Sequence, residues 1–91
     1  MFLHLGQYTV IKTDDIVGIF DIDNTTVSKY TRNYLSEATK KNRIVNVSLE
    51  LPKSFIVCKE KNGEETVYIS QLAPQTLVKR FSQSRDGGFK F

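Results

Sequence analysis

Short apolar runs recur along the 91-residue chain, and the polar residues between them predict a series of strands near the N-terminus. Residues 2–5 (FLHL) and 8–12 (YTVIK) are rich in apolar and β-branched residues, and Gly6-Gln7 forms a turn between them. Thr13-Asp14-Asp15 interrupts the pattern, and residues 16–22 (IVGIFDI) follow as another apolar run. The first quarter of the chain is therefore expected to form three strands.

The period then changes to that of a helix. Apolar residues recur at intervals that place them on one helix face, namely Val27, Tyr30, Tyr34, Leu35 and Ala38. Residues 23–25 (DNT) are of the types that cap a helix N-terminus. Lys40 and Lys41 suit the negative end of the helix dipole. These features predict an amphipathic helix over about residues 25–41.

The second half of the chain returns to strand patterns. Residues 44–51 (IVNVSLEL) alternate as in a half-buried strand, which Pro52 ends. Residues 53–61 and 64–71 are two further β-rich runs, separated by Asn62-Gly63. Because Asn-Gly is the preferred pair for a type I′ turn, we expect a hairpin with a two-residue loop.

That loop length fixes which residues of the hairpin face one another. It predicts the cross-strand pairs Cys58 with Val67, Ile56 with Ile69, and Val57 with Tyr68. Both faces of the hairpin are then apolar near its base, whereas an open sheet in a small domain normally has one face in solvent. Either the helices cover both faces or another subunit covers one. We take the pattern to favour an oligomer, with its interface at Phe55, Val57 and Tyr68.

The chain is expected to close with a second helix that begins at Pro74, where a missing N–H has no cost. Residues 82–91 contain a Gly pair and no period, and are interpreted as a flexible C-terminal tail. The predicted order is β-β-β-α-β-β-β-α. We expect an α+β fold with a small, mainly antiparallel sheet of about six strands, forming a single domain over residues 1–81.

Composition narrows the class of protein. The net charge is +3, and residues 26–44 carry five Lys and Arg side chains against Glu37 alone, so one basic surface is expected. The chain shows no signal peptide and no apolar run of membrane-spanning length, so we expect a cytoplasmic protein. Cys58 and His4 are the only residues of their types, which excludes an internal disulfide and a cysteine zinc site. We interpret Cys58 as a small buried hydrophobe.

One stretch resembles a catalytic motif. In IVGIFDIDNTTV, Asp21 and Asp23 follow an apolar run, as do the nucleophile and acid-base residues of haloacid dehalogenase-type phosphatases. Those enzymes also need an acidic pair at another strand end of a parallel sheet, which this sequence does not offer. The two aspartates are therefore predicted to end a strand and cap a helix. We expect no enzyme, no cofactor and no metal site.

Four other stretches carry a resemblance to a family. They are FLHLG at residues 2–6, DIVGIFD at 15–21, PKSFIV at 52–57 and YISQLAPQTLVKR at 68–80. In this order they resemble the extracellular matrix regulatory (Rem) family of biofilm regulators, and specifically its RemB-like branch. The similarity extends from about Phe2 to Phe81.

The resemblance implies a DNA-binding transcriptional regulator that supports the expression of matrix genes. By way of the RemA-like branch of the family, the resemblance also implies ring-shaped oligomers that bind double-stranded DNA through arginines on a basic rim. In this sequence the first of those arginine positions falls at Asp14 or Asp15, and the others fall around Leu51-Pro52. We expect the DNA contacts to come from Lys12, Lys40, Lys41, Arg43 and Lys53.

Two functions therefore stay open at this point. The first is a DNA-binding regulator that acts as a homo-oligomer, in which repeated basic patches contact one duplex. The second is a protein-interaction subunit that partners a related regulator and does not contact DNA. The aspartates at the first arginine position favour the second function.

Overall fold

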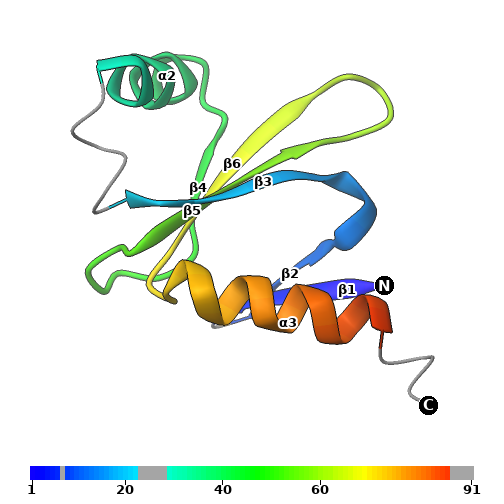
Figure 1. Cartoon of the computed structure of the whole chain (residues 1–91). Coiled ribbons are helices and arrows are strands. Elements are labelled where there is room, and N and C mark those ends of the chain that lie inside the picture. The colour runs from blue at the N-terminus through cyan, green and yellow to red at the C-terminus, as the bar shows by residue number, and fades with distance from the viewer. Residues whose placement is uncertain (7, 23–28, 87–91) are drawn as a thin grey trace.

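The computed structural model describes residues 1–6, 8–22 and 29–86. The elements in chain order are β1 (Phe2–Gly6), β2 (Thr9–Lys12), a 3-10 turn (Thr13–Asp15), β3 (Ile16–Asp21), α2 (Lys29–Lys40), β4 (Ile44–Asn46), β5 (Ser54–Lys59), β6 (Glu65–Ser70) and α3 (Pro74–Asp86) (Figure 1). This order confirms the predicted α+β fold. Pro74 is the first residue of α3, as expected from its missing N–H.

The six strands of the described residues form two sheets rather than one. β1 and β2 make an antiparallel pair, and a second sheet has the strand order β3-β5-β6-β4. β4 runs parallel to β6, and the other pairs are antiparallel. The 3-10 turn redirects the chain after β2, and the Thr13 N–H donates to the Met1 carbonyl at 3.1 Å. As a result β3 pairs with β5 instead of extending the first sheet.

Both faces of the four-stranded sheet are covered within one chain (Figure 1). α2 lies over one face, where a core of buried residues forms around Ala38, Phe55, Val57 and Val67. The β1–β2 hairpin and α3 cover the opposite face. The core there contains Leu3, Leu5, Ile11, Val47, Ile56, Cys58 and Leu77. The first of the two sequence-based alternatives, in which the chain covers its own sheet, therefore describes the fold.

The hairpin register differs by one residue from the prediction. The Glu60 N–H donates to the Glu64 carbonyl and the Gly63 N–H donates to the Glu60 carbonyl, so the loop contains three residues rather than two. Gly63 has a φ of +91°, whereas Asn62 is outside the left-handed region. This is the three-residue loop in which only the glycine needs a positive φ.

The new register changes which side chains share a face. Val57 pairs with Val67, and Ile56 pairs with Tyr68. Since a shift of one residue reverses the faces of a strand, Tyr68 packs on the side of β1, β2 and α3. Phe55 and Val57 are buried on the α2 side, with exposed fractions of 4% and 7%. The prediction that Phe55, Val57 and Tyr68 form one interface therefore does not hold, because Tyr68 lies on the opposite face of the sheet from the other two.

Two element boundaries also differ from the predictions. β4 ends at Asn46, and residues 48–52 form a loop instead of continuing the strand. Residues 82–86, which the sequence assigned to the tail, continue α3. The predicted first turn of the central helix lies at residues 25–28, outside the described residues. No helix in the described part of the chain has the length and apolarity needed to cross a membrane.

Candidate functional site

The C-terminal end of α2 is shaped by its capping motif. Asn42 adopts a left-handed conformation with φ 58°. The Asn42 N–H donates to the Thr39 carbonyl at 3.1 Å, and the Arg43 N–H donates to the Ala38 carbonyl at 2.8 Å. This pair of bonds is a Schellman motif, in which asparagine replaces the usual glycine. It turns the chain sharply and places Arg43 directly before β4.

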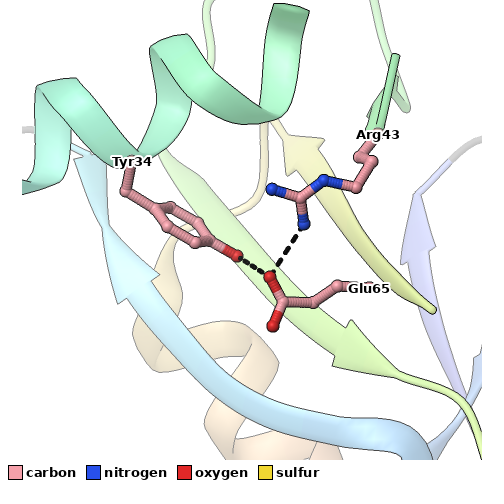
Figure 2. A network of polar contacts seen from close by, with 3 residues as sticks. All are labelled: Tyr34, Arg43 and Glu65. Atoms are coloured by element: carbon pink, nitrogen blue, oxygen red, sulfur yellow. Dashed lines mark hydrogen bonds and ion pairs between the residues drawn. The ribbon is translucent and has the colours of Figure 1, made fainter. Parts of the chain in front are cut away.

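Arg43 is part of a three-residue polar network between α2, β4 and β6 (Figure 2). Its Nη1 lies 2.8 Å from Oε1 of Glu65, and the Tyr34 hydroxyl donates to the same oxygen at 2.8 Å. The side chains of Arg43 and Glu65 are 23% and 32% exposed. The network joins the middle of α2, at Tyr34, and the segment that follows the helix, at Arg43, to the start of β6.

The network also shifts the protonation equilibria of its members. The hydrogen bonds from Tyr34 and Arg43 hold the pKa of the Glu65 carboxyl below its ordinary value. Burial, followed by the hydrogen bond to Glu65, raises the pKa of Tyr34. The hydrogen bond to Glu65 raises the pKa of Arg43. Glu65 is therefore ionised throughout the neutral range and neutralises the Arg43 guanidinium.

Replacing Glu65 by glutamine is expected to reduce the acid sensitivity of the fold. A carboxyl whose pKa is lowered by folding stabilises the native state above its ordinary pKa of 4.5, and that stabilisation is lost as the pH falls. Denaturant midpoints measured from neutral pH down through this range should therefore fall less steeply in Glu65→Gln than in the wild type. Glu37→Gln is the matched control, because Glu37 is exposed on α2 outside the network. Equal pH profiles for Glu65→Gln and the wild type would contradict the role of Glu65.

The structure brings some of the predicted DNA-binding cations together and separates others. Lys40 and Lys41 are exposed at the end of α2, next to Arg43. Lys53 directly precedes the first residue of β5, whereas Lys40 and Lys41 lie towards the last residue of that strand. The two ends of β5 are about 17 Å apart. Lys12 is exposed on β2 and lines a hollow on the opposite face of the sheet, together with Asp15 and Glu60. Lys40 and Lys41 are therefore the pair best placed to act together.

Beside α2, an apolar groove of about 370 Å³ opens towards solvent, with Glu65 at its lining. Its walls come from α2, β3 and β5, and the Phe20 ring stacks on Phe55 with their centroids 5.0 Å apart. Val17 is 64% exposed and Tyr30 is 85% exposed. Sequence reasoning missed this groove and the Tyr34–Arg43–Glu65 network, since neither follows from a local pattern.

Comparison with known proteins identifies the family. A model described as "Extracellular matrix regulatory protein A-like" (RemA-like) matches residues 2–81. The chain belongs to the RemA-like family. It is also 35% identical over 80 residues to "Extracellular matrix regulatory protein B" of Bacillus subtilis (strain 168), which covers 88% of this chain and 89% of that protein. The resemblance to the RemB-like branch is confirmed.

The D-x-D stretch lies in a different setting from that of a phosphatase nucleophile. Asp21 ends β3, which is an edge strand that pairs antiparallel to β5. The corresponding phosphatase strand belongs to a parallel sheet. Asp23 lies outside the described residues. Among the residues that the structure describes, no group of three or more His, Cys, Asp or Glu side chains is placed to hold a metal ion.

The single cysteine of this RemA-like chain is a core residue. Cys58 is 4% exposed, and burial raises the pKa of its thiol to about 11. A thiol with this pKa is almost entirely protonated at neutral pH and is a poor nucleophile. His4 is exposed on β1, where its carbonyl lies 3.4 Å from Nη1 of Arg80.

Proposed function

We propose that this RemA-like protein is a cytoplasmic, DNA-binding transcriptional regulator of extracellular matrix genes that acts as a homo-oligomer. The observation that carries the proposal is the similarity, over nearly the whole of both chains, to a protein named for extracellular matrix regulation. The family match over residues 2–81 spans both cores of the fold. The proposal therefore concerns the whole folded unit rather than a shared motif.

Physical chemistry supports an assembly over a single copy. Affinity for duplex DNA grows with the number of phosphates that lysine and arginine neutralise. One copy has a net charge of +3, and Glu65 already neutralises Arg43. Lys40 and Lys41 remain exposed at the end of α2. An oligomer repeats this pair, and several weak contacts to one duplex reinforce one another through effective concentration.

A specific observation favours the second function, a subunit that partners a related regulator without contacting DNA. Arg43 is engaged in the chain's own ion pair, and Asp14 is exposed on the 3-10 turn where the resemblance implies an arginine. Carboxylates repel phosphate, so these features weaken a DNA-binding surface. Both functions require protein-protein contact, and they differ in the DNA contact alone.

Titration of duplex DNA with the purified protein at several salt concentrations tests the proposal, with the mass measured by light scattering in the same buffers. We expect a mass above that of one 10.4 kDa chain. The logarithm of the affinity should fall linearly with the logarithm of the salt concentration, by about 0.9 for each phosphate contacted. If the protein has an oligomeric mass but does not bind DNA at low salt, the DNA-binding function is refuted and the second function, a partner subunit without DNA contact, is favoured. A monomeric mass would overturn the homo-oligomer.

A further inference from the structure

The loop at residues 48–52 presents two leucines to solvent on a fixed frame. The Val47 N–H donates to the Ile69 carbonyl and the Lys53 N–H donates to the Ser70 carbonyl, each at 2.9 Å. Both ends of the loop are therefore held by neighbouring residues of β6. Within it, Ser48 Oγ accepts a hydrogen bond from the Glu50 N–H at 3.1 Å. We call residues 48–52 the leucine loop.

Within the described part of the chain, nothing covers the two leucines. Leu49 is 104% exposed and Leu51 is 79% exposed. Single exposed apolar residues are ordinary on protein surfaces, but two large ones on a loop pinned at both ends form a preorganised apolar projection. Burying both side chains against apolar surface is favourable, and the hydrogen bonds at the two ends of the loop reduce the conformational freedom that binding removes.

The groove beside α2 is an apolar recess of matching character. It is lined by Val17, Phe20, Tyr30, Tyr34, Phe55 and Val57. The Tyr34–Arg43–Glu65 network holds α2 at its middle and just beyond its C-terminal end, and Tyr30 is outside it. Near the start of the helix Tyr30 is 85% exposed, and across the groove Val17 is 64% exposed. We call this recess the aromatic groove.

The leucine loop and the aromatic groove lie on opposite sides of the four-stranded sheet. Val47, which leads into the loop, belongs to the core shared with β1, β2 and α3. Phe55 and Val57, which line the groove, belong to the core under α2. One copy therefore cannot place its own loop in its own groove, whereas the loop of a second copy can reach it.

Glu65 in the lining of the groove is already paired with Arg43, and the exposed charges at the rims of the two surfaces are complementary. Glu50 lies between the two leucines and is exposed. Lys29 precedes Tyr30 at the start of α2 and is also exposed. Opposite charges at the edge of an apolar contact favour one orientation of two partners and disfavour others.

We propose that the leucine loop of one copy inserts into the aromatic groove of the next copy. The inference rests on the proposed homo-oligomer and specifies the contact that builds it. Because the two surfaces differ, the contact is heterologous, and an open assembly keeps a free loop at one end and a free groove at the other until it closes on itself. The partner at the groove is thus a second copy of this chain.

The test uses two variants with opposite defects. Leu49→Ser/Leu51→Ser removes the projection, and Tyr30→Asp places a carboxylate in the groove, where it also repels Glu50. All three positions are solvent-exposed, so the fold should be retained, as circular dichroism and denaturant midpoints would show. Val10→Ser is the matched control, because Val10 is 43% exposed on β2, outside both surfaces.

We expect both defective variants to associate at least tenfold more weakly than the wild type, and the control to keep the wild-type mass. An equimolar mixture of the two defective variants should form a dimer and nothing larger, since each partner retains one working surface. Wild-type mass in the leucine-loop variant, or a mixture that stays monomeric, would overturn the contact. If the contact is overturned but the wild type is oligomeric, the proposed function is unaffected. If the wild type is monomeric, the proposed homo-oligomer is refuted as well.

Discussion

Replacing Lys40 and Lys41 together by glutamate is expected to weaken the binding of duplex DNA by more than tenfold at low salt. Each replacement changes the charge by two units, so the formal charge of one copy falls from +3 to −1. Both side chains are exposed at the end of α2, where glutamate adds repulsion of phosphate to the lost attraction. In an assembly the loss is repeated in every copy that contacts the duplex.

The measurement is a salt titration of DNA affinity for the wild type and the variant, with the mass checked by light scattering. Lys79→Glu/Arg80→Glu is the matched control, because it makes the same change in net charge at exposed positions of α3, across the sheet from α2. We expect the control to retain most of the affinity, and the Lys40/Lys41 variant to show a smaller salt slope than the wild type. Equal losses in both variants would mean that net charge, rather than the end of α2, governs binding.

Patterns that are local in sequence predicted the elements of this fold. The helical stripe that contains Tyr34, Leu35 and Ala38 does face the sheet, and Pro74 does begin α3. These outcomes follow from the period of the helix and from the missing N–H of proline. The division of the strands between two sheets was not predictable in this way, because a short turn at residues 13–15 is compatible with either pairing.

The hairpin shows where a local signal is ambiguous. Asn-Gly suits a two-residue loop, but a three-residue loop also needs a glycine at its left-handed position, and Gly63 serves there. The tertiary structure decides between the two loops, since the observed register places Val67 under α2 with Phe55 and Val57. In the observed register Tyr68 lies on the other face of the sheet from Val57, so the three residues of the expected interface are not on one surface.

The candidate site depends on long-range proximity. Arg43 and Glu65 are 22 positions apart, and they meet because β4 runs parallel to β6. The alternation of residues 44–51 predicted a strand, and residues 44–46 do form one. The same alternation could not show that Leu49 and Leu51 project into solvent. Exposure depends on what the rest of the chain leaves uncovered, which no window of sequence contains.

Replacing Ile56 by alanine is expected to lower the free energy of unfolding by about 2 to 5 kcal/mol, the range for truncating a buried isoleucine. Ile56 has an exposed fraction of 0% in β5, an interior strand of the four-stranded sheet. It pairs with Ile19 on one side and Tyr68 on the other, and it packs in the core that β1 and α3 complete. Neighbours on all sides prevent the site from collapsing, so a cavity adds to the lost transfer free energy.

Ile56→Val provides the graded control, because it removes a single methylene and is expected to cost about 0.5 to 1.5 kcal/mol. Urea titrations should shift the midpoints in this order while the slopes stay constant, since the surface exposed on unfolding hardly changes. A loss below about 1 kcal/mol in Ile56→Ala would mean that the core relaxes around the alanine. Such relaxation would require β1 or α3 to move towards the sheet, and the two layers on that face would then not be closely packed.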